Sequence, residues 1–427
     1  MKYIKRLTEN MFVLSLIKKA NTIIFGFLTT VLIHHLLSPE MKGQYEYINN
    51  IIVTLTTILN MGITLVLPNY VRKNKKWTLS TFYILALFQF VINIFLSLLA
   101  WVIFRDNVYF LYGMAVASGV FSLQSLNSTL IYNFKITVFA NILGVFTNVV
   151  ILAVAFFVKF QNFNIVFVAL IVKELLCSII CYCAMAKSIH LSEVKYSEWV
   201  GIIIAGIVPM LTSLLSILNY KVDVIELKWL GVTDYNIGIY SVGLSLSEYV
   251  LLMSDVFKDV LFNKTASADN IAIINKSLRA CSSIMIIAYI CIICFGKIII
   301  KLVYGNSYIE SYGVSIIVIF GTFSMLYFKL LGTLFVAQGK WNFYFLTLLG
   351  SVVLNITSNF LLIPLIGIYG AALTSLLSYS FAGIVFILKY CKTYKLKIQD
   401  VLFIRTDDLK SIYKLLRNGN SIGNGKL

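Results

Sequence analysis

Seven charged side chains inside long apolar stretches are the residues of this sequence that could carry chemistry. Burying a charge in a membrane is costly, so such a group usually faces a charged partner or a water-filled cavity on an ion or substrate pathway. The chemistry indicated is the reversible binding of charged solutes. The seven are Lys18, Lys19, Lys173, Glu174, Glu248, Asp255 and Lys329.

Two of the acidic residues belong to a polar stripe in the stretch 236–261. On a helix the stripe falls within about 80° of arc, and its members are Ser241, Ser245, Glu248, Asp255 and Asp259. We interpret it as a cavity lining, with Glu248 and Asp255 as sites that couple transport to H⁺ or Na⁺. In the alternative, Glu248 pairs with a lysine of another helix, and Asp255 and Asp259 lie near the inner membrane interface.

The lysines, with two neutral residues of the stretch 44–67, form a candidate substrate cavity. Its members are Lys18, Lys19, Asn50, Thr54, Lys173 and Lys329. Lys18 and Lys19 could instead extend to the cytoplasmic surface, because long basic side chains reach toward water. Lys173 and Glu174 are adjacent and project about 100° apart on a helix, which predicts that each pairs with a different helix. Whether that pair has a structural or a functional role is open.

The composition predicts the elements that position these side chains. Hydrophobic residues make up 59% and charged residues 12%, against roughly 25% charged residues in soluble domains. This excludes a soluble enzyme, a secreted disulfide scaffold and a nucleic-acid-binding protein. We predict an all-α polytopic membrane protein with twelve transmembrane helices, in two six-helix bundles around a central cavity. The spans are expected at about 12–36, 44–67, 80–104, 108–131, 136–158, 164–186, 200–220, 236–261, 278–300, 312–336, 341–363 and 366–389.

Lysine and arginine set the expected orientation. With the N-terminus inside, fifteen of these residues fall on the cytoplasmic side and seven on the other, before nine more in the tail. Basic residues favour cytoplasmic loops, so both termini are expected in the cytoplasm. The tail is expected to contain a basic amphipathic helix from Thr406 to about Gly419 that contacts membrane lipids.

The sequence also indicates a duplicated unit. Gly43 and Tyr45 open one span as Gly-x-Tyr, and Gly238 and Tyr240 open another in the same way, 195 residues later. Parallel repeats of this kind are typical of transporters. The predicted domains are residues 1–195, residues 196–390 and the basic tail 391–427.

No pattern in the sequence indicates catalysis. There is no phosphate-binding glycine-rich loop with its Lys and Ser or Thr, no His cluster and no nucleophile elbow. Six of the seven cysteines lie inside apolar runs without metal-site spacing. We therefore expect no enzyme activity, no catalytic residue, no cofactor and no metal, and an energy source in a gradient or in the substrate.

Three stretches resemble the bacterial O-antigen and polysaccharide flippases (Wzx type) of the multidrug/oligosaccharidyl-lipid/polysaccharide exporter superfamily. The matching residues are Pro39, Gly43, Tyr45 and Gly62, then Asp223, Gly238 and Tyr240, and last Asn359, Pro364, Gly367, Gly370 and Ala371. The Arg-Leu-Gly that precedes the first motif in that family is replaced here by His34-His35-Leu36-Leu37-Ser38.

The resemblance implies a flippase of the bacterial inner membrane for undecaprenyl-diphosphate-linked oligosaccharide, working by alternating access. It implies H⁺ or Na⁺, or the membrane potential, as the driving force, and a polysaccharide polymerase and chain-length regulator as partners. Whether the glycan is O-antigen of lipopolysaccharide or another polysaccharide is open. The alternatives are a drug or ion antiporter or a lipid II-type flippase of the same superfamily, a polysaccharide polymerase, and a membrane scaffold.

Overall fold

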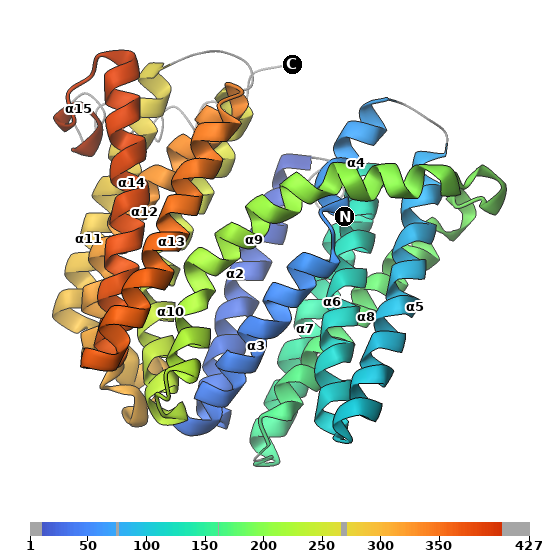
Figure 1. Ribbon diagram of the computed structural model, residues 1–427, viewed down its shortest axis with the longest axis horizontal. Helices are drawn as coiled ribbons and strands as arrows, with labels where there is room; N and C mark the ends of the chain where they lie inside the picture. Colours follow the sequence, from blue (N-terminus) through green and yellow to red (C-terminus); the bar gives the residue numbers. More distant parts are fainter. Residues whose placement is uncertain (1–10, 74–76, 161, 266–270, 404–427) are drawn as a thin grey trace, which may run out of the picture. The chain divides into compact units, whose positions relative to one another are not determined.

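The computed structural model describes residues 11–73, 77–160, 162–265 and 271–403, which form helices and no strand (Figure 1). The all-α prediction is therefore confirmed for this part of the chain. The helices are α2 (Met11–Leu36), α3 (Pro39–Leu59), α4 (Ile63–Arg72), α5 (Thr78–Phe104), α6 (Asn107–Tyr132), α7 (Phe134–Phe157), α8 (Asn164–Met185), α9 (Trp199–Trp229), α10 (Asp234–Thr265), α11 (Ile271–Val303), α12 (Ser311–Ala337), α13 (Trp341–Ile366), α14 (Ile368–Tyr394) and α15 (Gln399–Leu402).

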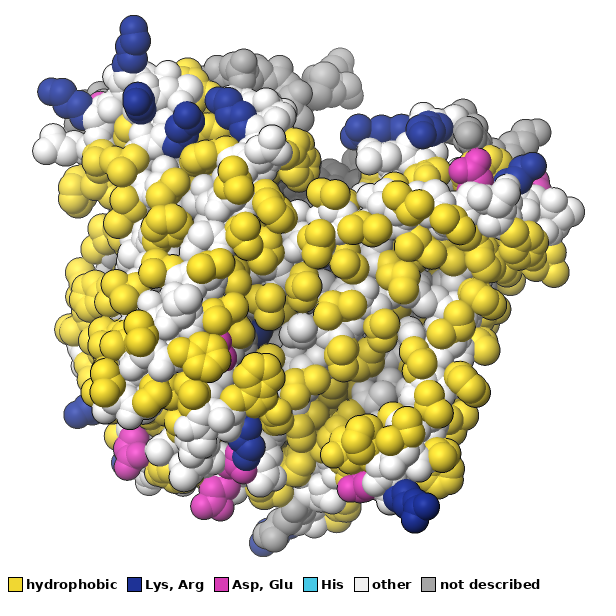
Figure 2. Space-filling view, viewed as in Figure 1, with side chains coloured by type: hydrophobic (Ala, Val, Ile, Leu, Met, Phe, Trp, Pro, Cys, Tyr) yellow, Lys and Arg dark blue, Asp and Glu magenta, His cyan; other side chains and the backbone are white. Residues whose placement is uncertain are grey.

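Ten helices among the described residues are long and apolar enough to cross a membrane. The two other predicted spans correspond to α2, whose apolar part Ala20–Leu36 is shorter, and to the 32-residue α10. Hydrophobic side chains cover the middle of the helices, and Lys and Arg gather toward their ends (Figure 2). A multi-pass membrane protein follows from these features. The tail helix predicted from Thr406 lies outside the described residues.

The chain divides into two compact units. The first comprises Met1–Lys228 with Thr233–Gly238, and the second comprises Trp229–Val232 with Ile239–Leu427. The predicted domain boundary at residue 195 falls in the connector between α8 and α9. The helix α9 belongs to the first unit, together with the first turn of α10.

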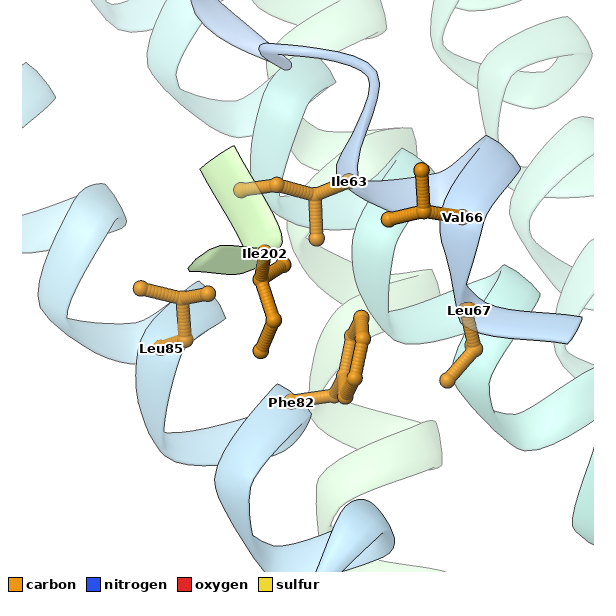
Figure 3. Packing of buried hydrophobic residues seen from close by; sticks show 6 residues of the cluster. All are labelled: Ile63, Val66, Leu67, Phe82, Leu85 and Ile202. Atoms are coloured by element: carbon orange, nitrogen blue, oxygen red, sulfur yellow. The ribbon is translucent and has the colours of Figure 1, made fainter. Parts of the chain in front are cut away.

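The hydrophobic contacts of α9 explain this grouping. Ile202 of α9 is buried in a cluster with side chains of α4 and α5 (Figure 3). The other members are Ile63, Val66, Leu67, Phe82 and Leu85. Burying such side chains contributes about 1.5–3 kcal/mol each, so this cluster holds the start of α9 on the first unit.

The predicted span 44–67 is not one continuous helix. α3 ends at Leu59 and α4 begins at Ile63, with Met61 and Gly62 at φ +49° and +66° between them. A buried amide network supports the break, because backbone groups freed at membrane depth need partners inside the protein. Gln89 donates to the carbonyl of Leu59. Gln124 donates to Gln89 at 2.7 Å and to Asn60 at 3.3 Å.

The break is also in backbone contact with α9. A Cβ added to Gly62 would lie 2.1 Å from the carbonyl oxygen of Gly206, and a Cβ added to Gly206 would lie 2.1 Å from the carbonyl oxygen of Met61. Both distances are far below van der Waals contact, so glycine is needed at both positions.

Replacement of Gly206 by Ala is therefore expected to destabilise the first unit. The added methyl group must displace the backbone at Met61, and overpacking of this kind costs about 1–3 kcal/mol. Thermal unfolding of the purified protein in detergent should show a lowered midpoint. Gly26→Ala is the matched control, since nothing lies within 4 Å of a Cβ at Gly26. An equal midpoint for both variants would contradict the proposed contact.

The end of α9 corrects a second prediction. The sequence placed an outer connector at about 221–235, whereas α9 continues to Trp229 and leaves a connector of residues 230–233. Asp223 and Glu226 are 0% and 2% exposed within the helix. Their charges make the segment look like a loop in sequence, but the fold buries them on the last turns of α9. Pro209 lies inside α9, and the helix bends along its length (Figure 1).

The starts of α3 and α10 make a reciprocal contact within the first unit. A Cβ on Gly43 would lie 1.9 Å from the carbonyl oxygen of Asp234, and a Cβ on Gly238 would lie 2.0 Å from that of Pro39. Gly43 also approaches Gly238, the residue 195 positions later, because a Cβ on Gly43 would lie 3.0 Å from the backbone nitrogen of Gly238. The glycines of that motif allow two helix backbones to meet.

In the second unit α14 packs closely on α12 and α13. A Cβ on Gly383 of α14 would lie 1.9 Å from the carbonyl oxygen of Ser324 on α12. The short α15 is attached to α11, because Arg279 donates to the carbonyl of Asp400 at 2.8 Å and Ser282 donates to that of Leu402 at 2.8 Å. The segment that follows α14 is therefore bound to α11 through α15.

Candidate functional site

Two adjoining cavities lie inside the first unit. The larger, of about 480 Å³, lies among α3, α6, α7 and α8, and the smaller, of about 250 Å³, lies among α2, α3, α7 and α8. Asn49, Leu170 and Lys173 line both. Together they fall in the size range of small-molecule sites, about 300–1,000 Å³. We refer to the pair as the inner cavity.

Hydroxyl and amide groups make up the polar lining of the inner cavity. They belong to Thr22, Thr29, Asn49, Thr56, Thr57, Ser122, Asn141 and Asn148. The Ser122 hydroxyl is buried and, like that of Thr29, has no hydrogen-bond partner among the described residues. A buried polar group without a partner costs free energy, so both hydroxyls are suited to a hydroxylated ligand or to water.

The predicted separation of Lys173 and Glu174 is wrong. Their side chains form an ion pair with 2.8 Å between Nζ and Oε1, and both line the larger part of the inner cavity. The flexible lysine side chain is long enough to curve back across the 100° step between adjacent positions. The cavity therefore contains a cation and an anion that neutralise each other and that a charged ligand can separate.

Asn50, a neutral residue predicted to line the cavity, is absent from the described lining, and its neighbour Asn49 is present there. Asn50 is 1% exposed, and its carbonyl accepts a 2.7 Å hydrogen bond from Thr54. The adjacent Asn49 lines both parts of the cavity instead, on the helix face that carries Ile52, Thr56 and Thr57. Spacings of three, seven and eight residues from Asn49 would have identified this face in the sequence.

Lys18 and Lys19 both belong to α2, and Lys18 lies outside the described lining of the inner cavity. Lys18 is partly buried, and its carbonyl accepts a 3.0 Å hydrogen bond from Thr22, which does line the cavity. Lys18 thus lies one helical turn away from that lining. The side chain of Lys19 is outside the described part of the structure.

The second unit brings a predicted cavity cation and a predicted coupling anion together. Lys329 of α12 and Asp255 of α10 form an ion pair with 3.0 Å between Nζ and Oδ2. Their side chains are 18% and 27% exposed, so both are accessible to small solutes. Glu248, also on α10, is partly buried.

Sequence reasoning missed a buried charge pair at the start of α3. Lys42, which is 3% exposed, pairs with Glu46 at 2.6 Å, one helical turn later. The prediction began this helix at residue 44 and left Lys42 in a loop. Ser38 accepts from the backbone N–H of Met41 and Pro39 is the first helical residue. That Ser-Pro signature marks a helix start and would have revealed the pair.

Among the described residues no group of three or more His, Cys, Asp and Glu side chains could hold a metal ion. The inner cavity offers hydroxyls, amides and one ion pair. Such groups can bind, orient and release a polar ligand.

Comparison with known proteins gives matches in structure only. No family model matches the chain, and no curated protein matches it in sequence. An inward-facing MATE multidrug resistance transporter of the MOP superfamily aligns with a TM-score of 0.66 at 14% identity, over 88% of this chain and 94% of its own.

Two further solved structures have a similar likeness. The lipid II flippase MurJ in an inward closed conformation aligns with a TM-score of 0.62 at 13% identity, over 97% of this chain and 94% of its own. An outward-facing MATE transporter aligns with a TM-score of 0.61 at 13% identity, over 92% and 96%. All three are described as transporters or flippases. The chain therefore has the same fold as these MATE transporters and MurJ.

Proposed function

We propose that this protein is a flippase that moves undecaprenyl-diphosphate-linked oligosaccharide repeat units from the cytoplasmic to the periplasmic leaflet of the bacterial inner membrane. The observation that carries the proposal is the inner cavity, with its many hydroxyl and amide groups and the separable Lys173–Glu174 pair. In this proposal both termini are cytoplasmic and access alternates between the two sides of the membrane.

The lining chemistry suits a glycan carried on a diphosphate. Sugar hydroxyls both donate and accept hydrogen bonds, as do Asn and Ser side chains. The Ser122 and Thr29 hydroxyls, without partners among the described residues, would gain one. The diphosphate needs cations. Lys173 in the first unit and Lys329 in the second can each supply one when the ligand displaces the paired carboxylate, Glu174 or Asp255.

The membrane potential can contribute to the driving force. Moving two negative charges out of an inside-negative cell is favourable by roughly 4–5 kcal/mol per 100 mV. In the proposed cycle Glu248 and Asp255 accept H⁺ or Na⁺, so that an ion gradient adds to this term. A polysaccharide polymerase would take up the translocated units on the far side.

Two other functions of the same fold are the alternatives. The likeness to MATE transporters favours a drug or ion antiporter, and the likeness to MurJ favours a lipid II flippase. An antiporter is expected to use the carboxylates of Glu174, Glu248 and Asp255 and to have little need of Lys173 and Lys329.

Complementation separates the three functions. The chain is expressed in bacteria that lack their oligosaccharide flippase, in bacteria depleted of their lipid II flippase, and in bacteria sensitised to drugs. We expect surface glycan to return in the first strain, with loss of the lipid-linked repeat units that accumulate on the inner leaflet. Rescue of the second strain alone, or drug resistance without surface glycan, would contradict the proposal.

A further inference from the structure

A third cavity of the first unit, of about 640 Å³, has a different lining from the inner cavity. Its lining comes mainly from α3 and α6 and includes Asp106 of the α5–α6 turn and Phe163 of the α7–α8 turn. Both turns lie at the same end of the first unit (Figure 1). Among its lining residues, only Ile52 also lines the inner cavity. We refer to it as the outer pocket, since the proposed topology places this end in the periplasm.

We propose that the outer pocket binds one monosaccharide ring of the glycan, a neutral pyranose, next to the inner cavity along α3. This inference rests on the proposed function and names the part of the substrate that the pocket takes. It follows from three features of the lining, which are aromatic rings held in place, fixed hydrogen-bonding groups, and a net charge that disfavours phosphate.

Aromatic rings form one side of the pocket. They belong to Tyr47, Tyr109, Tyr112 and Phe163. Tyr109 stacks on Phe104 with 4.5 Å between ring centroids and is still 43% exposed. Tyr112 donates to Asn164 at 3.2 Å and packs edge-on against Phe167 at 5.1 Å. Rings held by packing offer flat apolar faces to the C–H side of a pyranose at little cost in conformational entropy.

Polar side chains at fixed positions complete the lining. Asp234 accepts from Gln44 at 3.2 Å through one oxygen and pairs with Lys228 at 2.6 Å through the other. Asp106 accepts from the backbone N–H of Val108 at 3.0 Å as the N-cap of α6. A carboxylate has about four acceptor sites, so each retains capacity for sugar hydroxyls. Such a combination of apolar faces with a few placed polar groups is typical of small-molecule sites.

The charges of the pocket distinguish sugar from phosphate. Its lining carries two carboxylates, Asp106 and Asp234, and one ammonium group, that of Lys228. One negative charge is left after the Lys228–Asp234 pair is subtracted. A diphosphate or a lipid phosphate would be repelled by Asp106, whereas the charges of Lys173 and Glu174 in the inner cavity cancel and Lys173 becomes available when a ligand displaces Glu174. A neutral sugar ring, and not the diphosphate, is thus assigned to the outer pocket.

The test measures binding of simple glycosides to the full-length protein in phosphatidylethanolamine–phosphatidylglycerol nanodiscs. The probes are methyl β-glucoside, methyl β-galactoside and methyl N-acetyl-β-glucosaminide, observed by saturation-transfer NMR. We expect transfer to the ring protons of at least one probe. Tyr109→Ala should weaken that binding by about tenfold, the equivalent of roughly 1.4 kcal/mol. Asp106→Asn should weaken it less, since Asn preserves the helix cap and removes only the charge.

Tyr196→Ala is the matched control, because Tyr196 is 58% exposed and lies outside the three cavities. It should leave the signal unchanged. Absence of transfer to all three probes, or an undiminished signal in Tyr109→Ala, would overturn the inference. Binding of glycerol 3-phosphate that depends on Tyr109 would also overturn it and would indicate a lipid headgroup site.

The complementation experiment keeps this inference separate from the flippase proposal. Restored surface glycan without glycoside binding would reject the outer pocket and leave the flippase standing. Glycoside binding that depends on Tyr109, without restored glycan in the complemented cells, would support the pocket and reject the flippase.

Discussion

Replacement of Lys329 by Ala is expected to lower flipping in cells by about tenfold or more, or at least roughly 1.4 kcal/mol of transition-state stabilisation. The change removes a cation proposed to meet the diphosphate and leaves Asp255 without the ammonium group 3.0 Å away. Lipid-linked repeat units should accumulate on the inner leaflet and surface glycan should fall. Normal surface glycan in this variant would contradict the assignment of Lys329 to the substrate.

The Asp255 partner makes it possible to separate a transport role from a structural one. Removing one member of a partly buried ion pair destabilises the protein, whereas removing both can be nearly neutral. The double variant Lys329→Ala/Asp255→Ala should therefore regain the unfolding midpoint of the parent and still fail to flip. Recovery of both stability and flipping would show that the pair only holds α10 and α12 together.

Replacement of Asp255 is expected to change the ion dependence of transport. Asp255→Asn should abolish the dependence of transport on H⁺ or Na⁺ in proteoliposomes, because a neutral amide cannot exchange a proton or attract a cation at this position. Lys329→Ala should change transport of the glycan whichever ion is supplied. Unchanged ion dependence in Asp255→Asn would reject the coupling role.

Replacement of Asn49 by Leu is the second change with a large expected effect. Asn49 lines both parts of the inner cavity, so the variant removes an amide from the proposed sugar path and inserts an apolar side chain. We expect flipping to fall by about tenfold or more, because hydrogen-bonding sites discriminate strongly when a polar partner is lost. Surface glycan in the complemented strain is the measurement.

A comparison with Asn50→Leu tests whether Asn49 or Asn50 contacts the substrate. The sequence assigned Asn50 to the cavity, whereas the structure buries its side chain away from a hydrogen-bond partner among the described residues. Asn49→Leu should therefore impair flipping more than Asn50→Leu when both proteins are present in equal amounts in the membrane. The reverse order would restore the assignment made from the sequence.

The helices themselves could be predicted from the sequence. Long apolar stretches must form helices in a membrane, because a backbone in lipid has to satisfy its own hydrogen bonds. That constraint is local, so composition was enough to place each span near the observed helix. The start of α3 and the end of α9 were misplaced because charged residues such as Lys42 and Asp223 are buried by contacts that hydropathy does not record.

The candidate site was predictable only in part. The sequence identified the costly charges, Lys173, Lys329 and Asp255 among them, because charge in an apolar stretch is visible without a fold. It could not give their partners. Pairing of Lys173 with its neighbour depends on rotamers, and pairing of Lys329 with Asp255 depends on how α12 packs on α10.

By itself the sequence determined that this chain is a helical membrane protein. It has few charged residues inside its apolar stretches, and a Gly-x-Tyr motif that is repeated after 195 residues. Tertiary structure decided that the two glycines meet at a backbone contact, that the predicted span 44–67 breaks at Gly62, and that Asn49 lines the cavity. The physical reason is the range of the interactions. Helix formation in a membrane follows from the solvent and the local chain, whereas cavities and ion pairs follow from distances between helices far apart in sequence.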